Sequence, residues 1–383
     1  MFVVRPAVLA VAAAVLLVGC VSGGPTTLPA ANDSWQSGTL QDNVPVDEKS
    51  TLALNPVDYG NRRVVVATFS EPIQGRRVEL QHRTGTGWEV AASANEDTNG
   101  RVEFLAPYGD GDYRAVAQAS ADGTHVAVAT TKQSEADQWK LDFSEGFDGN
   151  SLNSEYWSPR QTGYYFGSRL CSATYPSNLA LNDGSLLVSV RKADAARTQT
   201  VTANAARQMG VPASEACPNG VWDAAMVSTE GKYTFRYGVV AVRAKFPTQP
   251  GVHGSVWLQR ADPKGAEIDF IETFGLKYGI QHKVHYDENG KSVMEGGYVK
   301  SLPEVKNEAW WNQYHVFSVE WTKDEYVFRV DGVETLRTRS GISKGQEFII
   351  LSMLASDWEL KRVVPDEMPA TMAVDWVKVW KEK

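Results

Sequence analysis

Three carboxylates fall within six residues, Glu267-Ile268-Asp269-Phe270-Ile271-Glu272, in a segment otherwise made of strand-forming residues. Side chains alternate between the two faces of a strand, so Glu267 and Asp269 share one face and the apolar residues share the other. Strict alternation would place Glu272 in the apolar core, where an unpaired carboxylate costs several kcal/mol. A bulge that absorbs one residue between Asp269 and Glu272 returns all three acids to one face. The segment therefore predicts a bulged strand on an open sheet face.

The chain from residue 51 onward alternates short apolar runs with turn signals, which predicts an all-β protein. In residues 51–137 about seven such runs are separated by turns such as Asn99-Gly100, the pattern of a small immunoglobulin-like β-sandwich. Its acids are scattered, so we expect a spacer or accessory module, with carbohydrate binding as the alternative. Residues 138–383 form a second, larger β domain that contains the three acids.

The overall charge limits the partners of the chain. Its 38 lysines and arginines against 46 aspartates and glutamates leave a net charge of −8. No sequence-wide basic field is therefore available to hold a phosphate backbone, which argues against nucleic acid as a partner.

The N-terminus predicts export and membrane attachment. Arg5 precedes an apolar run from Ala7 to Val18, which is shorter than the roughly 20 residues of a bilayer span, so residues 1–20 are expected to be a cleaved signal peptide. Residues 17–20 end in Cys20 and resemble the lipobox of bacterial lipoproteins, which implies lipidation of Cys20 on the extracellular or periplasmic side of the membrane. An ordinary signal peptide is the alternative. Residues 21–50 are polar and predict a flexible tether.

Two glutamates flanking an aspartate on an open face are what retaining glycoside hydrolysis requires. One carboxylate attacks the anomeric carbon and the other protonates the leaving oxygen, with the two groups about 5 to 5.5 Å apart. We assign Glu267 as the nucleophile, Glu272 as the acid/base, and Asp269 as the group that orients the nucleophile. Three neighbouring acids cannot all ionise easily, so at least one should keep a proton at neutral pH. A solvated acidic edge strand or a calcium site would also fit these residues alone.

The acidic segment resembles the bulge-type signature of glycoside hydrolase family 16, the laminarinase-like enzymes. Flanking segments resemble that family in the same order: residues 141–149, 178–186, 235–247, 316–321 and 372–380. The resemblance covers residues 139–383. It implies a β-jelly-roll sandwich, a polysaccharide-binding concave face, retention of configuration and no cofactor for catalysis.

The expected reaction is therefore endo-hydrolysis of a β-linked polysaccharide, with β-1,3-glucan or mixed-linkage β-1,3/1,4-glucan as the leading substrate. Another β-glycan such as a galactan, transglycosylation, and a non-catalytic glycan-binding module are the alternatives. We expect a monomer.

Six further residues are candidates for substrate binding. Arg243 would point toward the cleft if its strand neighbours the catalytic strand, and it would otherwise be a surface arginine. The resemblance implies that Asn178 contacts sugar hydroxyls and that His285 contacts the substrate or the acid group, although either could be structural. The tryptophans could stack on the apolar faces of sugar rings or belong to the core. They are Trp222, Trp257 and Trp358.

The remaining predictions concern a structural ion and a disulfide. The resemblance implies a calcium ion bound by Asp375, with Glu145 and a carbonyl near Gly184, because hard oxygen ligands suit that ion. A plain surface aspartate is the alternative at position 375. Cys171 and Cys217 are the two cysteines left after lipidation of Cys20, and export favours a disulfide between them.

Overall fold

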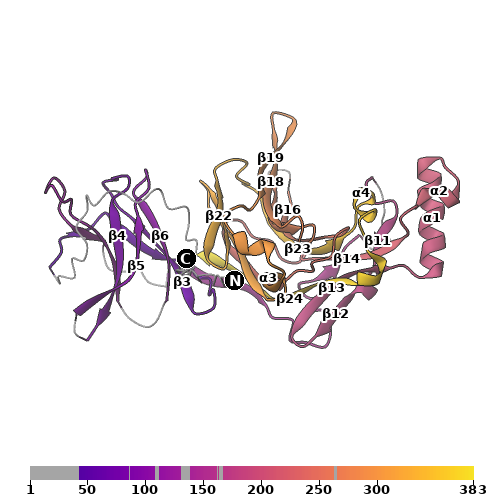
Figure 1. Ribbon diagram of the computed structural model, residues 1–383, viewed down its shortest axis with the longest axis horizontal. Coiled ribbons are helices and arrows are strands. Elements are labelled where there is room, and N and C mark those ends of the chain that lie inside the picture. The colour runs from indigo at the N-terminus through magenta and orange to yellow at the C-terminus, as the bar shows by residue number, and fades with distance from the viewer. Residues whose placement is uncertain are drawn as a thin grey trace, which may run out of the picture.

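The computed structural model describes residues 43–85, 87–107, 112–130, 139–161, 163, 167–262 and 265–383. Within these ranges strands make up most of the regular secondary structure, as predicted, and the chain forms two bodies (Figure 1). The predicted signal peptide, Cys20, most of the tether and the boundary at residues 137–138 lie outside the described ranges. None of the helices in these ranges has the length and apolar character that a membrane crossing needs.

The N-terminal module, residues 43–130, is a small β-sandwich. Its strands are β1 (Val46–Asp47), β2 (Thr51–Leu54), β3 (Arg62–Thr68), β4 (Arg77–Thr84), β5 (Gly87–Asn95), β6 (Arg101–Pro107), β7 (Tyr113–Ala117) and β8 (Val128–Thr130). A five-stranded sheet, β1-β8-β7-β4-β5, packs on a three-stranded sheet, β2-β3-β6, around a shared apolar core. The tether prediction is wrong at its end, because β1 pairs with β8 and makes residues 43–50 part of the module.

The C-terminal body, residues 139–383, contains sixteen strands and four short or medium helices in the described ranges. Strands β9–β16 are Trp139–Glu145, Ser158–Pro159, Ser172–Thr174, Leu179–Asn182, Ser185–Lys192, Trp222–Ser228, Gly238–Lys245 and His253–Arg260. Strands β17–β24 are Glu267–Thr273, Ile280–Glu288, Lys291–Tyr298, His315–Trp321, Tyr326–Val330, Val333–Thr338, Glu347–Leu354 and Ala370–Glu382. The helices are α1 (Ala195–Met209), α2 (Ala213–Ala216), α3 (Glu308–Trp311) and α4 (Asp357–Leu360), and the 3₁₀ turns are Pro176–Asn178, Pro303–Lys306 and Pro365–Glu367.

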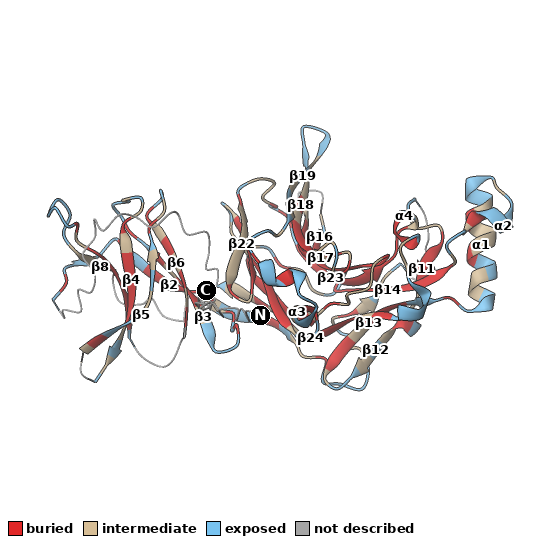
Figure 2. Cartoon of the chain, in the orientation of Figure 1, coloured by how far each residue is buried: buried red, intermediate tan, exposed pale blue. Residues whose placement is uncertain are grey.

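The strands of the C-terminal body make two layers. One layer runs β19-β18-β17-β16-β23-β14, the other runs β13-β24-β15-β20-β21-β22, and the β13–β14 pair joins them. Buried residues line the strands of both layers, whereas α1 and α2 are only partly buried and the tip of the β18–β19 hairpin is exposed (Figure 2). This arrangement confirms the predicted jelly-roll sandwich, and it leaves one face of the β17 layer open.

The N-terminal module packs against the outer face of β15 and β20. Val57, Tyr59 and Val64 of the module form one apolar cluster with Val239, Ala241 and Val316 of the C-terminal body. At the edge of the cluster, Arg329 on β21 is fully buried and makes a bidentate ion pair with Glu103 on β6, at 2.8 and 2.9 Å. The two bodies therefore share a core and a buried charge pair.

Candidate active site

The three acids lie on β17, where the predicted bulge is confirmed. The pairing of β17 with β18 shifts register between Asp269 and Glu272, and the pairing with β16 shifts at the same place. The bulge leaves Ile268 and Phe270 fully buried in the core while all three acids share the open face. Strand β18 sets one polar residue opposite each acid. The pairs are Glu267 with His285, Asp269 with Lys283, and Glu272 with Gln281.

Beneath the open face, His282 forms a hydrogen bond with the backbone carbonyl of Phe270, a residue of the bulge that has no register partner on β16 or β18. Its Nδ1 lies 2.9 Å from the carbonyl oxygen of Phe270, and because a carbonyl can only accept, Nδ1 carries the proton. Its Nε2 lies 2.8 Å from the hydroxyl of Thr335, and its ring stacks on Phe328. Burial lowers the pKa of His282 to about 4, so the imidazole is neutral at physiological pH. His282 is therefore a positioning residue for the bulge.

Two replacements of His282 should distinguish the effect of its hydrogen bond from the effect of its size. His282→Leu should lower kcat about tenfold, because an unpaired buried carbonyl costs about 1 to 3 kcal/mol and the bulge can relax away from the productive geometry. His282→Asn places an amide donor near the Nδ1 position and should recover most of kcat. Steady-state kinetics on the folded variants measure this, and equal losses in the two variants would contradict a positioning role.

The same variants predict a pH effect on stability. Because burial lowers the pKa of His282 from 6.5 to about 4, the unfolded chain binds a proton between these pH values that the native chain does not. This residue therefore makes the free energy of unfolding fall as pH decreases from 6.5 toward 4. The stability deficit of His282→Asn relative to wild type should shrink by about 2 kcal/mol between pH 7 and pH 4.5 in urea unfolding. A deficit that is constant with pH would rule this out.

Glu267, Asp269 and His285 form one electrostatic unit. One polar atom from each lies within 4.8 Å of the others, and His285 Nε2 is 3.3 Å from Asp269 Oδ2. Burial, and then repulsion from Asp269, raises the pKa of Glu267 to about 7. The hydrogen bond to Asp269 raises the pKa of His285. The unit therefore keeps a proton near neutral pH, and the same three groups have the composition to hold a metal ion.

Glu272 is held by two donors that the sequence reasoning missed. Its Oε2 accepts from Lys283 Nζ at 2.8 Å and from Gln281 Nε2 at 3.0 Å. Both donors belong to the alternation Gln281-His282-Lys283-Val284-His285, in which every second residue is polar and faces the acids. That alternation was the signal available in the sequence. Both contacts fall on one carboxylate oxygen of Glu272.

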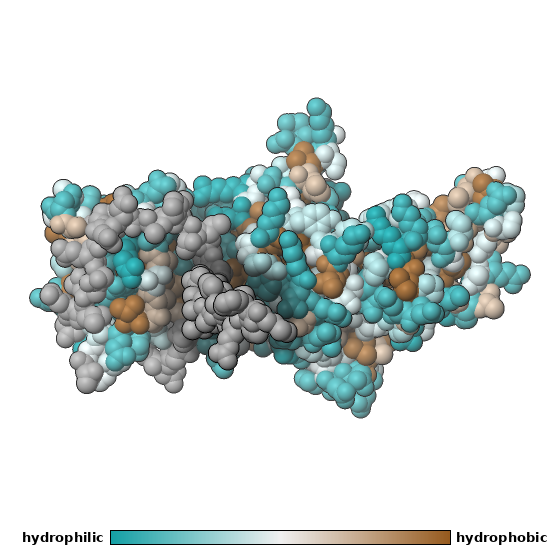
Figure 3. Space-filling view, in the orientation of Figure 1, coloured by the Kyte–Doolittle hydropathy of each residue, from teal (hydrophilic) through white to brown (hydrophobic). Residues whose placement is uncertain are grey.

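The neighbouring strands extend the open face around the acids. Trp257 on β16 lies opposite Asp269, is partly exposed, and donates its indole N–H to Ser352 on β23 at 3.1 Å. The surface is hollowed between the tip of the β18–β19 hairpin and the α1–α2 end, above β16, β23 and β14 (Figures 1 and 3). Trp257 is thus placed beside the acids as the stacking hypothesis requires.

The other predicted sugar contacts have mixed placements. Trp358 on α4 is 49% exposed and stands next to Phe274, with their ring centroids 5.9 Å apart. Trp222 is buried and its indole N–H donates to the carbonyl of Asn219, so it is a core residue and does not face the substrate. Asn178 is also buried and donates its side-chain amide to the carbonyl of Ala224. Trp358 is therefore the second exposed platform.

The expectation that Arg243 faces the cleft is corrected by the topology. Strand β15 pairs with β20 and β24 in the other layer, so it does not neighbour β17. Arg243 instead forms an ion pair with Asp375 and lies over the ring of Tyr314. A cation thus already neutralises Asp375, and Glu145 accepts from the backbone N–H of Phe147. As arranged, these two carboxylates do not fit the predicted calcium site.

A β-jelly roll with paired carboxylates on its open face defines the class of carbohydrate-active β-sandwiches. The model of glycosyl hydrolases family 16 matches residues 187–378, which is half of the chain. The chain belongs to this family.

Individual relatives agree with the family assignment. The chain is 24% identical over 287 residues to glucan endo-1,3-beta-glucosidase A1 of Niallia circulans, covering 69% of this chain and 41% of that protein. It is 20% identical over 291 residues to a beta-glucanase of Rhodothermus marinus, covering 66% and 89%. The laminarinase structure from Rhodothermus marinus superposes with a TM-score of 0.50 at 21% identity, covering 64% of this chain and 98% of that one. The chain thus spans less than half the length of the first relative.

Proposed function

We propose that the C-terminal body is a retaining endo-glycosidase that hydrolyses a β-linked polysaccharide, with β-1,3-glucan or mixed-linkage β-1,3/1,4-glucan as the substrate. The observation that carries the proposal is the bulge that sets Glu267, Asp269 and Glu272 on one open face opposite the polar residues of β18. Membership of family 16 and the glucanase names of its relatives support the substrate class.

In the first chemical step Glu267 attacks the anomeric carbon and Glu272 protonates the departing oxygen. Attack needs Glu267 as a carboxylate, and His285 can accept the proton that the acidic unit keeps near neutral pH. To protonate the leaving group, Glu272 must carry its proton on an oxygen that no other residue occupies. Lys283 and Gln281 both contact Oε2, so Oε1 is left to carry the proton to the glycosidic oxygen.

In the second step Glu272 removes a proton from water, which attacks the glycosyl-enzyme and releases the sugar with its configuration retained. The two carboxylates supply all the proton transfers and the nucleophile, so this chemistry requires no cofactor. Asp269 lies between them, buried, and its hydrogen bond with His285 fixes its orientation.

A panel of polysaccharides tests the proposal. The chain without residues 1–20 is incubated with curdlan, barley mixed-linkage glucan and a β-galactan, and the products are sized and their new anomeric ends followed by NMR. We expect a ladder of oligosaccharides with retained β configuration from a glucan. A ladder from the galactan alone would change the substrate, longer products would indicate transglycosylation, and binding without cleavage would indicate a glycan-binding module.

The N-terminal features complete the proposal. The chain would be exported and attached to the bacterial membrane through a lipid on Cys20, and the N-terminal module would be an immunoglobulin-like spacer that holds the enzyme away from the membrane. The lipobox resemblance of residues 17–20 supports the anchor. Fractionation of cells that express Cys20→Ser tests it, because the variant should leave the membrane fraction, and a variant that stays there would refute the anchor.

A further inference from the structure

Beyond Glu272, the open face carries two arginines and aromatic rings that the hydrolytic step does not use, and Lys283 connects them to the acid. Lys283 Nζ lies 2.8 Å from Glu272 and 5.8 Å from the centroid of Phe274, which follows Glu272 by two residues. Phe274 in turn neighbours Trp358 on α4. Lys283, Phe274 and Trp358 therefore lie beyond Glu272, on the side away from Glu267. The acid that protonates the leaving oxygen lies on the leaving-group side of the scissile bond, so these residues border the leaving group.

Two arginines border this region, and no carboxylate in the described ranges forms an ion pair with either. Arg362 lies over the rings of both Trp358 and Tyr278, at 5.2 and 5.1 Å. Stacking uses the faces of a guanidinium and leaves its N–H edges free to donate. Arg169 Nη2 lies 3.4 Å from His253, while its Nε is buried without a hydrogen-bond partner among the described residues. The carboxylates of Glu267 and Glu272 attract Arg169 electrostatically, but at distances longer than that of an ion pair.

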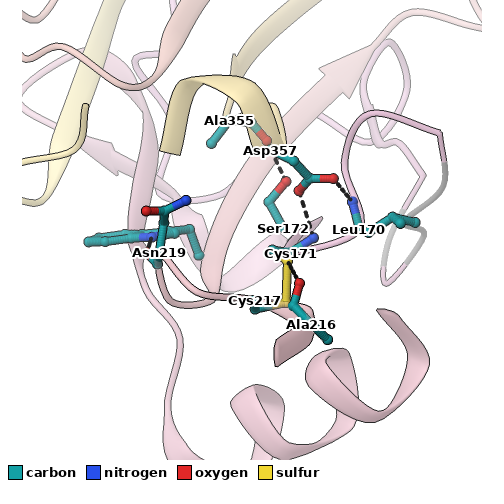
Figure 4. The surroundings of a disulfide bond; sticks show 9 residues. Leu170, Cys171, Ser172, Ala216, Cys217, Asn219, Ala355 and Asp357 are labelled. Atoms are coloured by element: carbon teal, nitrogen blue, oxygen red, sulfur yellow. Dashed lines mark hydrogen bonds between the residues drawn. A yellow bond between two sulfur atoms is a disulfide. The ribbon is translucent and has the colours of Figure 1, made fainter. Parts of the chain in front are cut away.

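The region is held rigidly by its surroundings. Asp357 at the start of α4 accepts from the backbone N–H groups of Leu170 and Cys171, at 2.8 and 2.9 Å, beside the disulfide from Cys171 to Cys217 (Figure 4). Glu359 pairs with His253 at 2.7 Å. Trp358 stands between these two anchored acids, so α4 presents it on a fixed support. The predicted disulfide is thus confirmed, and it lies next to the loop that carries Arg169.

We propose that Arg169, Lys283 and Arg362, with the rings of Phe274 and Trp358, form a leaving-group subsite for a sugar that carries an oxyanion. The proposal rests on the proposed glycosidase function, because that function defines which side of Glu272 holds the leaving group. It narrows the substrate within that function from a neutral glucan to a β-linked glycan whose sugars carry a carboxylate or a sulfate ester. The rings stack on the apolar face of the sugar, and the arginine edges donate to a carboxylate or a sulfate ester, both of which match the planar fork of a guanidinium.

Binding and turnover of matched oligosaccharides test the subsite. The probes are a neutral laminari-oligosaccharide, its C6-carboxylated derivative and its C6-sulfated derivative. Binding is measured by calorimetry on the full chain carrying Glu267→Gln, and kcat/KM is measured on the wild-type chain. We expect at least one anionic probe to bind about tenfold tighter than the neutral one at low salt, with the preference weakening as salt rises. The probe that is preferred distinguishes a uronate from a sulfate ester.

Variants assign the preference to the named arginines. Arg362→Gln and Arg169→Gln should each reduce the anionic-to-neutral ratio of affinity several-fold. Arg236→Gln is the matched control, because Arg236 is exposed and lies over Tyr237 elsewhere on the molecule. A ratio of one or less in the parent chain, or a ratio that survives both arginine changes, would overturn the subsite. The binding assay decides this even if no polymer is cleaved, whereas absence of cleavage across the panel would count against the glycosidase itself.

Discussion

Glu267→Gln and Glu272→Gln should each lower kcat on the polysaccharide by about a thousandfold or more. The first variant lacks the nucleophile, and the second lacks the proton donor that the leaving sugar needs. Both amides keep the shape of the side chain, so the fold should be retained. Asp269→Asn should fall between these variants and wild type, because it removes the charge that orients His285 but no reacting atom. Reducing-end assays and circular dichroism measure the two effects.

An activated substrate separates the two roles. A dinitrophenyl glycoside needs no acid for departure, so Glu272→Ala should still form the glycosyl-enzyme and should recover turnover with azide, giving a β-glycosyl azide. Glu267→Ala with azide should give the α-glycosyl azide by direct displacement. NMR of the products distinguishes the anomers. The reverse pattern would exchange the roles, and full activity in either glutamine variant would remove that residue from catalysis. Glu288→Gln, exposed at the end of β18, is the control and should keep wild-type activity.

The bulge was predictable because its cause is local. A regular strand would have buried Glu272 with Ile268 and Phe270, and the energy of burying an unpaired carboxylate decides against that arrangement. The side chain that binds the Phe270 carbonyl was not predictable in the same way. His282 reaches Phe270 only because β18 lies beside β17, and it is fixed from behind by Thr335 on β22. Such contacts depend on which strands become neighbours.

Strand order also explains the incorrect placement of Arg243. Alternation correctly separated Arg243 from the apolar side of β15, since Val240, Val242 and Ala244 lie in the core. It could not tell which layer β15 joins, and the strand pairs with β20 and β24. The outward side chain therefore reaches Asp375 on β24. The two residues that were predicted to bind sugar and calcium are partners of each other because of this pairing.

Arg329→Met should destabilise the chain by about 3 to 5 kcal/mol, the usual cost of removing one partner of a buried ion pair. Arg329 is fully buried, and burial alone would lower its pKa, but Glu103 and Glu320 raise it above its ordinary value, so it is charged. The change leaves the nearly buried Glu103 without its bidentate partner, with Arg101 as its remaining close ion-pair partner among the described residues. Because Glu103 lies in the N-terminal module, the loss should appear as weaker coupling between the two bodies, with separate transitions in calorimetry.

Paired replacement tests whether the charge pair itself is responsible. Arg329→Met combined with Glu103→Leu removes both charges of the bidentate pair, so it should recover part of the stability lost in Arg329→Met. The recovery is partial because Glu320 keeps its charge without Arg329. Glu230→Gln is the control, because its ion pair with Arg160 is half exposed and should be worth less than about 1 kcal/mol. A loss in Arg329→Met no larger than in Glu230→Gln would mean that the bodies do not depend on this contact. The shared cluster around Tyr59 and Val239 would then be the main attachment, and the module would be a rigid part of the enzyme through apolar packing alone.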